Sequence, residues 1–405
     1  MDFNTRTING DEKVAIGDEY QTTLITYPTH AELSTILQNQ FEVLDEQFYH
    51  GMPTFAVRWH EGIVPSTEEQ DLVFRGIADR CEQLSVWPVV RWRDKSNGEY
   101  FIRFVPKEKQ PKSDVRVNYG LFVATMGTIA LAGFWQVTSP IFLTLFYGPT
   151  GWTPFDVFWN TFIFIAALMG IIFTHEMGHY LSSRKLGIEA TPPYFIPGLP
   201  QIGGTFGAFI QQKSPPYNRR DLFDMGVAGP LAGFVVTLFV LIWGFFLSVP
   251  VTAEQIAALD AAYPGMSGSI GVPLLFQLME ILFADFIPAG GTLYMHPVAF
   301  ASWIGMLITS LNLFPISQLD GGHALRAIVG GKNHKYIGWA GIVVMLLAGY
   351  YLMALLILFI SQGGEHPGPL NDTIEIPLWR KMLFVISMII LVLCIPPLWE
   401  MVGFF

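Results

Sequence analysis

The sequence predicts an all-α polytopic membrane protein with a small soluble α+β domain at its N-terminal end. Of the 405 residues, 51% are apolar and only 14% are charged, whereas about a quarter of the residues of a soluble protein are charged. The charges are unevenly placed, since residues 1–115 hold 12 of the 23 Lys and Arg and 19 of the 33 Asp and Glu. Several later stretches reach the ~20 apolar residues that a helix needs to cross a bilayer.

The net charge of −10 lies mostly in this N-terminal part and gives no reason to expect a nucleic-acid partner. The two cysteines, Cys81 and Cys394, are too few for a disulfide framework or a thiolate zinc site. The first residues, MDFNTRTINGDEK, have no apolar core, so we do not expect a cleaved signal peptide.

Residues 1–20 are expected to be a disordered tail, and residues 21–115 a soluble α+β head. A helix is predicted to begin near Ser66, because a capping residue there precedes two glutamates and one apolar stripe. The stripe consists of Phe74, Ile77, Ala78 and Cys81. Strands are predicted at 54–59, 87–92 and 100–105. The head contains no catalytic constellation, so we expect a regulatory or substrate-contacting module.

Residues 116–405 are the expected membrane domain, with its core at 155–330. About six membrane-spanning helices are predicted, at 118–147, 155–183, 223–249, 297–316, 336–360 and 379–403. The apolar stretch 272–288 is interrupted by Glu280 and Asp285, so it is expected to lie at the membrane interface.

The distribution of Lys and Arg predicts the orientation. The segments 148–154 and 250–296 contain none. The other connections contain Lys112, Arg116, Arg184, Lys185, Lys213, Arg219, Arg220, Arg326, Lys332 and Lys335. The positive-inside rule therefore places the head and both chain ends on the cytoplasmic side, with Arg380 and Lys381 as the exception.

One loop between two predicted spans, residues 190–215, is apolar and rich in Gly and Pro. It cannot be a spanning helix, and its β-forming residues predict a re-entrant β-hairpin with Gly203 and Gly204 near the turn. Non-helical backbone at membrane depth requires protein or a wet cavity beside it. We therefore expect a water-accessible pocket next to the second span.

The second span contains the motif His175-Glu176-Met177-Gly178-His179. Two histidines four residues apart lie on one face of a helix, so both imidazoles can reach one metal ion. Glu176 is placed to take a proton from a water molecule at that metal. The alternative is a polar patch satisfied by neighbouring helices. We favour the metal, because three ionisable residues inside an apolar span are costly without a partner.

A catalytic zinc site usually has a third protein ligand. We favour Asp320, which follows an apolar span interrupted by Pro315 and precedes two glycines that break the helix. The weaker candidates are Asp224, Glu189 and His323. Asn312 lies eight residues before Asp320. Its amide has two equally supported roles, donation to a developing oxyanion or a hydrogen bond between helices. Small residues near the start of the third span, Gly226, Gly229 and Gly233, indicate close helix packing.

These motifs resemble those of the site-2 protease family of intramembrane zinc metalloproteases, in its plant chloroplast and bacterial branch. The similarity consists of the histidine motif, Asn312 and Pro315 followed by Asp320-Gly321, the GGTFGAF loop and the AGPLAG segment. It implies that His175, His179 and Asp320 bind one Zn²⁺, that Glu176 is the catalytic base, and that Asn312 assists at the substrate carbonyl. No PDZ-like insertion is present between the two motif-bearing spans.

The sequence hypothesis is hydrolysis of peptide bonds in or near transmembrane segments of membrane-protein substrates. The main alternative is a divalent-metal transporter that uses the same His, Glu and Asp residues as a transit site. A second alternative is a catalytically silent scaffold. The expected location is a bacterial inner membrane or a plastid membrane. The sequence does not determine the oligomeric state.

Overall fold

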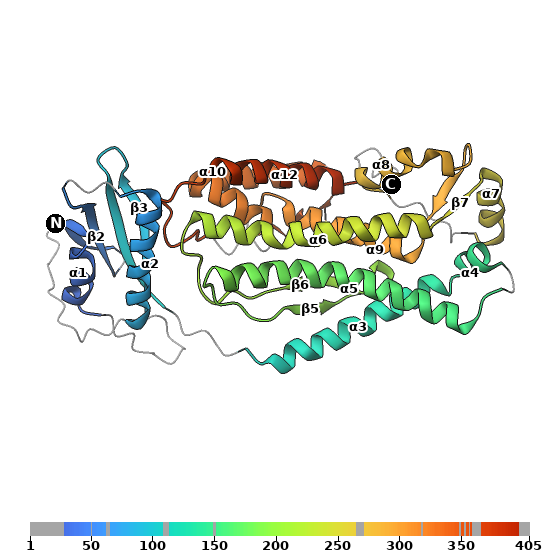
Figure 1. Cartoon of the computed structure of the whole chain (residues 1–405), viewed down its shortest axis with the longest axis horizontal. Coiled ribbons are helices and arrows are strands. Elements are labelled where there is room, and N and C mark those ends of the chain that lie inside the picture. Colours follow the sequence, from blue (N-terminus) through green and yellow to red (C-terminus); the bar gives the residue numbers. More distant parts are fainter. Residues whose placement is uncertain are drawn as a thin grey trace. The chain divides into compact units, whose positions relative to one another are not determined.

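The computed structural model describes residues 28–396, apart from 50, 62–64, 108–112, 149–150, 265–270, 317–318, 348–349, 352–353, 356 and 359–365. The predicted tail and Lys112 therefore lie outside the described residues. The chain divides into two compact units (Figure 1). The head unit combines the described residues before 112 with two short segments, Pro215–Asp221 and Gly368–Ile376. The membrane unit contains the rest.

The head unit is a four-stranded antiparallel sheet with two helices. Its elements are α1 (His30–Gln38), β1 (Phe41–Tyr49), β2 (Met52–Trp59), α2 (Thr67–Gln83), β3 (Val86–Asp94) and β4 (Glu99–Pro106), with strand order β1-β2-β4-β3. The helix α2 begins as predicted, because Ser66 and Glu69 form a capping box. The predicted stripe on α2 is buried, and the three predicted strands are confirmed as β2, β3 and β4.

The elements α1 and β1 were not predicted from the sequence. The strand β1 has the sequence FEVLDEQFY and is mostly half-buried or exposed. Its side chains therefore lack the clean alternation of apolar and polar residues by which a strand is recognised.

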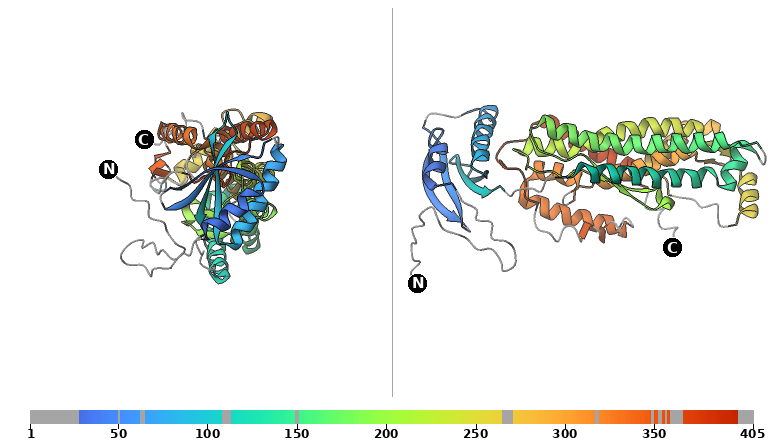
Figure 2. Two further views of the ribbon diagram at one scale, coloured as in Figure 1. Left: turned by 90° about the vertical axis from the view of Figure 1, so that its left-hand side faces the viewer. Right: turned by 90° about the horizontal axis from the view of Figure 1, so that it is seen from below.

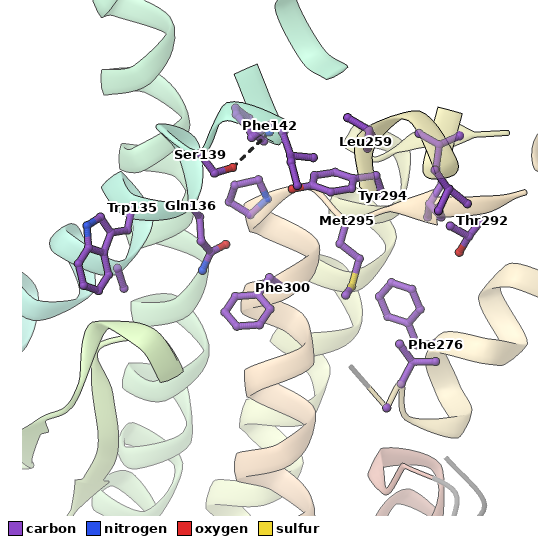
Figure 3. Close-up of a pocket in the computed structure, with 18 of the residues that line it drawn as sticks. Trp135, Gln136, Ser139, Phe142, Leu259, Phe276, Thr292, Tyr294, Met295 and Phe300 are labelled. Atoms are coloured by element: carbon purple, nitrogen blue, oxygen red, sulfur yellow. Dashed lines mark hydrogen bonds between the residues drawn. The ribbon is translucent and has the colours of Figure 1, made fainter. Parts of the chain in front are cut away.

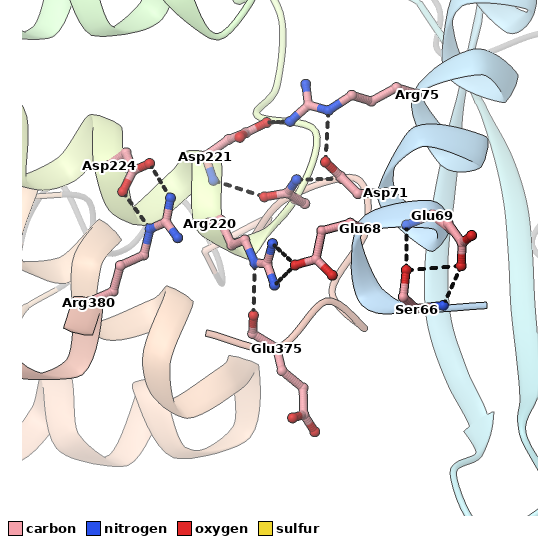
Figure 4. Close-up of polar contacts among 11 residues, drawn as sticks. Ser66, Glu68, Glu69, Asp71, Arg75, Arg220, Asp221, Asp224, Glu375 and Arg380 are labelled. Carbon is pink, nitrogen blue, oxygen red and sulfur yellow. Dashed lines mark hydrogen bonds and ion pairs between the residues drawn. The ribbon is translucent and has the colours of Figure 1, made fainter. Parts of the chain in front are cut away.

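Two segments that are distant in sequence extend the head sheet beyond β3. The Val90 amide donates to the Leu370 carbonyl at 2.8 Å, and the Leu370 amide donates to the Pro216 carbonyl at 2.9 Å. Leu370 is buried in the same hydrophobic core as α1 and α2. The side chains of Arg75 and Asp221 form an ion pair at 2.6 Å, shown in Figure 4. The segments Pro215–Asp221 and Gly368–Ile376 are thus integral parts of the head fold.

The membrane unit consists mainly of helices that run along one common direction (Figures 1 and 2). The helices are α3 (Val115–Val137), α4 (Pro140–Tyr147), α5 (Pro154–Lys185), α6 (Arg219–Leu247, whose first three residues belong to the head unit), α7 (Ala253–Ala262), α8 (Leu274–Leu282), α9 (Pro297–Leu313), α10 (Asp320–Leu347) and α12 (Leu378–Cys394). The short elements are β5 (Tyr194–Pro197), η1 (Pro200–Ile202), β6 (Thr205–Phe209), β7 (Val249–Val251), η2 (Ala284–Phe286) and β8 (Thr292–Tyr294).

Three helices in the described part of the chain are long and apolar enough to cross a membrane: α3, α5 and α6. The helix α9 is apolar but shorter. These helices indicate an integral membrane protein, and the count of about six spans stays a prediction. The first predicted span, 118–147, is divided into α3 and α4, because Ser139 caps a new helix that begins with Pro140.

The predicted hairpin is present as the antiparallel pair β5 and β6. Gly203 and Gly204 have φ values of 100° and 82°, which favour glycine. Thr128 on α3 donates from its hydroxyl to the Gly204 carbonyl at 2.6 Å. The turn of the hairpin is therefore fixed against α3, whereas its insertion into the membrane remains a prediction.

Candidate metal centre

Two helices bring His175, His179 and Asp320 together. His175 and His179 lie on α5, and Asp320 is the first residue of α10. The Asp320 Oδ2 atom is 3.1 Å from His179 Nε2 and 3.4 Å from His175 Nε2, and the two Nε2 atoms are 3.3 Å apart. The three side chains form one potential metal-binding group, and the site-facing His175 is only 3% exposed.

The spacing of these donor atoms fits a zinc ion. Tetrahedral zinc has ligand bonds of about 2.0–2.1 Å, which separates two ligand atoms by about 3.3 Å. The three measured separations lie within about 0.2 Å of that value. Two imidazole nitrogens and one carboxylate oxygen are also a typical ligand set of a catalytic zinc site, which keeps a fourth position open.

The position of Asp320 depends on the close approach of two helix ends. The helix α9 ends at Leu313, and Phe314 is extended with a ψ of 129°. A Cβ atom on Gly321 would lie 2.0 Å from the Leu313 carbonyl oxygen. Because only glycine fits there, the start of α10 can fold back onto the end of α9 and present Asp320 to the histidines of α5.

The helix α6 packs against the two histidines and fixes their orientation. His179 Nδ1 is 2.9 Å from the Met225 carbonyl oxygen. This hydrogen bond places the proton on Nδ1 and directs Nε2 to the metal position. A Cβ atom on Gly229 would lie 2.1 Å from His179 Nε2, and one on Gly233 would lie 3.0 Å from His175 Cβ. The glycines that indicated close packing therefore pack directly against the candidate ligands.

A cavity of about 550 Å³ surrounds this group. Its lining includes all five residues selected from the sequence, namely His175, Glu176, His179, Asn312 and Asp320. Glu176 is 4% exposed, and Asn312 Nδ2 lies 3.3 Å from His175 Nε2. The strand β6 and the residues after it contribute Ala208, Phe209 and Ile210 to the same wall.

The weaker candidates have other surroundings. Asp224 forms two hydrogen bonds of 2.7 Å with Arg380 (Figure 4). The Glu189 backbone amide donates to Ser214 Oγ, and Glu189 does not line the cavity. His323 does line it, and its Nδ1 is 2.7 Å from His366 Nε2. The contact of the Met225 carbonyl with His179 and the pairing of His323 with His366 were not predicted, because both contacts join segments that are distant along the chain.

The fold and the site define a class: a membrane-integrated helical protein with a candidate metal centre of two histidines and one carboxylate and with an adjacent glutamate. Residues 163–356 match peptidase family M50. The resemblance to site-2 proteases is confirmed for this part of the chain, and the family implies zinc as the metal, for which the three donors form a candidate site.

Curated relatives agree with this assignment. The chain is 31% identical over 238 residues to the probable zinc metalloprotease EGY1, chloroplastic, of Arabidopsis thaliana. The matched region covers 58% of this chain and 42% of that relative. It is 31% identical over 238 residues to the probable zinc metalloprotease EGY2, chloroplastic, of Oryza sativa subsp. indica, covering 57% and 41%. The chain thus spans less than half the length of these relatives. No solved structure matches the chain.

Proposed function

We propose that this protein is a zinc-dependent intramembrane endopeptidase that hydrolyses peptide bonds in or near transmembrane segments of membrane proteins. The observation that carries the proposal is one cavity lined by three zinc-fitting donors, Glu176 and residues of β6. Zinc at these donors supplies a Lewis acid that makes water acidic near neutral pH and polarises a carbonyl oxygen.

The side chains around the metal position supply the remaining functions. Glu176 accepts a proton from the attacking water as the C–O bond forms. It then returns that proton to the amide nitrogen as the C–N bond breaks, so the two products are a carboxylate and an amine. Asn312 is placed to donate a hydrogen bond to the carbonyl oxygen as negative charge develops there. Its place in the lining of the same cavity supports this role.

The strand β6 supplies a surface for the substrate backbone. A helix hides its carbonyl groups in internal hydrogen bonds, so a substrate must unwind before it can react. An unwound segment can pair with the edge of β6, which leads along the cavity wall to the catalytic groups. This surface would hold the scissile carbonyl near the metal.

The proposed location is a bacterial inner membrane or a plastid membrane, with six spans and the head on the cytoplasmic side. The chloroplastic relatives support the plastid membrane. The absence of Lys and Arg from 148–154 and 250–296 supports the orientation.

Zinc content and cleavage measured on the same samples test the function. Wild-type, Glu176→Gln and Asp320→Asn proteins are purified in detergent and incubated with a single-span test substrate. We expect about one zinc per chain and cleavage in the wild type, zinc without cleavage in Glu176→Gln, and loss of zinc in Asp320→Asn. Cleavage by zinc-loaded Glu176→Gln would contradict the proposed base. Metal flux through Glu176→Gln in vesicles, without proteolysis by the wild type, would support transport instead.

A further inference from the structure

A second and larger cavity, here called the distal cavity, lies in the membrane unit away from the metal centre. Its volume is about 1060 Å³. Figure 3 shows Gln136 and Phe300 on one side of it and Met295 and Phe276 on the other. The helix α9 contributes to both cavities. Phe300 near its start lines the distal cavity, and Asn312 in its last turn lines the cavity of the metal centre. Twelve helical residues correspond to about 18 Å.

The β5–β6 hairpin joins the two cavities as well. Pro200 and Gln201 in its turn line the distal cavity, whereas Ala208 and Phe209 line the cavity of the metal centre. Gln201 lies in η1 and Ala208 in β6, so one short hairpin contributes to both linings. Both cavities therefore fall within the ~30 Å length of one membrane-spanning helix. A substrate that reaches the metal centre along β6 has its other end near the distal cavity.

The lining of the distal cavity favours an organic cation. It contains the aromatic residues Trp135, Phe142, Phe276, Tyr294 and Phe300. It also contains two acidic residues, Asp260 and Glu280, and the described lining includes no Lys, Arg or His. Aromatic faces and carboxylates both attract a cation.

The charge of the surrounding region, residues 250–296, agrees with this preference. The distal cavity takes Asp260, Glu280 and Thr292 from the region 250–296, which contains four acidic residues and no Lys or Arg. No Lys or Arg of this region would repel a cation, and its four carboxylates give the region a negative potential.

We propose that the distal cavity is a substrate-recognition site that binds a Lys or Arg side chain following the non-cytoplasmic end of the substrate's transmembrane segment. The long apolar stem of such a side chain fits against the aromatic residues, while its charge reaches Asp260 and Glu280. This inference rests on the proposed proteolytic function for its substrate, but the binding itself does not require cleavage.

The spacing of the cavities predicts where cleavage occurs. If the segment between them stays helical, about 18 Å corresponds to about 12 residues between the bound basic residue and the unwound region at the metal centre. Moving the basic residue by four positions should therefore move the cleavage position by about four residues in the same direction.

Binding to full-length Glu176→Gln protein tests the proposal without turnover. The probes are two fluorescent single-span peptides in phosphatidylglycerol nanodiscs, one with a Lys at the non-cytoplasmic end and one with Gln at that position. We expect the Lys peptide to bind about tenfold more tightly. Combining Asp260→Asn with Glu280→Gln should reduce this preference to less than about twofold. The matched control combines Glu254→Gln with Asp285→Asn, which are acidic residues of the same region outside the cavity lining, and should keep the preference.

Equal binding of the two peptides to Glu176→Gln protein would overturn the proposal, even if the wild type cleaves substrates. A preference that disappears in phosphatidylcholine nanodiscs would overturn it too. The cationic choline headgroup of the lipid would then be the occupant of the distal cavity. A preference for Lys in a protein that cleaves nothing would instead keep the binding site and refute the proposed proteolysis. If the cleavage position stays the same when the Lys is moved, the distal cavity does not determine where the substrate is cut.

Discussion

At the scale of single residues, the candidate centre depends on the histidines of α5 and equally on two glycines of α6, which have no side chains that would occupy the space of the imidazoles. The imidazole of His179 occupies the space where a side chain at position 229 would lie, and the imidazole of His175 lies close to position 233. Glycine at both positions lets α6 approach α5 closely enough for the Met225 carbonyl to reach His179 Nδ1. The glycines thus position the donors without contacting the metal.

A single methyl group at position 229 tests this arrangement. In Gly229→Ala, the new Cβ atom would lie 2.1 Å from His179 Nε2, so the imidazole must leave the metal position. We expect the variant to lose most of its zinc and its proteolytic activity, measured by metal analysis and substrate cleavage. Gly170→Ala on α5 is the control, because a Cβ atom added there would have no neighbouring atom within 4 Å. Full zinc occupancy in Gly229→Ala would contradict the role given to Gly229.

The head offers a residue-scale test that depends on pH. Cys81 lies on the buried face of α2 and is fully buried, and this burial raises the pKa of its thiol to about 12. The unfolded thiol has a pKa of about 8.5. The contribution of Cys81 to stability is therefore complete below about pH 8.5 and declines as the pH rises toward the folded value.

In a Cys394→Ser background, Cys81 should react with iodoacetamide at pH 8.5 at least about a hundredfold more slowly than a free thiol, because only the thiolate reacts. Labelling rates with and without denaturant provide the measurement. Rapid labelling of the folded head would show that Cys81 is accessible, contrary to its burial.

At the scale of elements, the β5–β6 hairpin is the part of the site that is neither helix nor metal ligand. Its strands are short, and β5 contains Pro197. Phe206 and Phe209 on β6 are 61% and 51% exposed. A short edge strand beside the cavity of the candidate metal centre presents backbone groups that another chain can pair with. The hairpin is therefore the element that we expect to recognise substrate backbone.

Proline substitutions test the role of β6. Single Pro substitutions from Phe206 to Ile210 remove one backbone N–H each. We expect those that face the substrate to slow cleavage by about fivefold or more while zinc content stays unchanged, since one lost hydrogen bond costs about 1 kcal/mol or more. Alanine at Phe206, Phe209 and Ile210 keeps the N–H and serves as the control, since position 208 is already alanine and Gly207 has a φ of 93° that disfavours it. Normal cleavage by every Pro variant would rule out strand addition.

At the scale of the whole molecule, the head is built from three separate parts of the chain. Its sheet is completed by residues around Leu370 and Pro216. The segment Pro215–Asp221 leads directly into α6, the helix whose glycines support the histidines. The head therefore folds fully only when the chain that forms the membrane unit is present.

Removal of the negative charge of Asp221 tests whether the segment Pro215–Asp221 stabilises the head. Asp221 is 4% exposed and pairs with Arg75, so Asp221→Asn leaves a half-buried guanidinium with a weaker partner. We expect the head to lose about 1–3 kcal/mol of stability, seen as faster hydrogen exchange of the β3 amides in the full-length protein. Asp79→Asn, an exposed carboxylate on α2, is the control. Unchanged exchange in Asp221→Asn would show that the ion pair does not stabilise the head.

The sequence by itself determined what depends on neighbours along the chain. The stripe and cap of α2 follow from helical periodicity and the chemistry of its first turn, and His175 and His179 share a face because they are one turn apart. The turn at Gly203 and Gly204 was predictable because only glycine adopts such φ values readily.

Only the tertiary structure decided what depends on residues far apart in sequence. Asp320 was a choice among several carboxylates until the contact between Gly321 and Leu313 placed it beside His179. The membership of Leu370 in the head and the pairing of Asp224 with Arg380 were likewise invisible in the sequence. The physical reason is that local patterns report the conformation of one segment, whereas long-range contacts depend on how complete surfaces fit together.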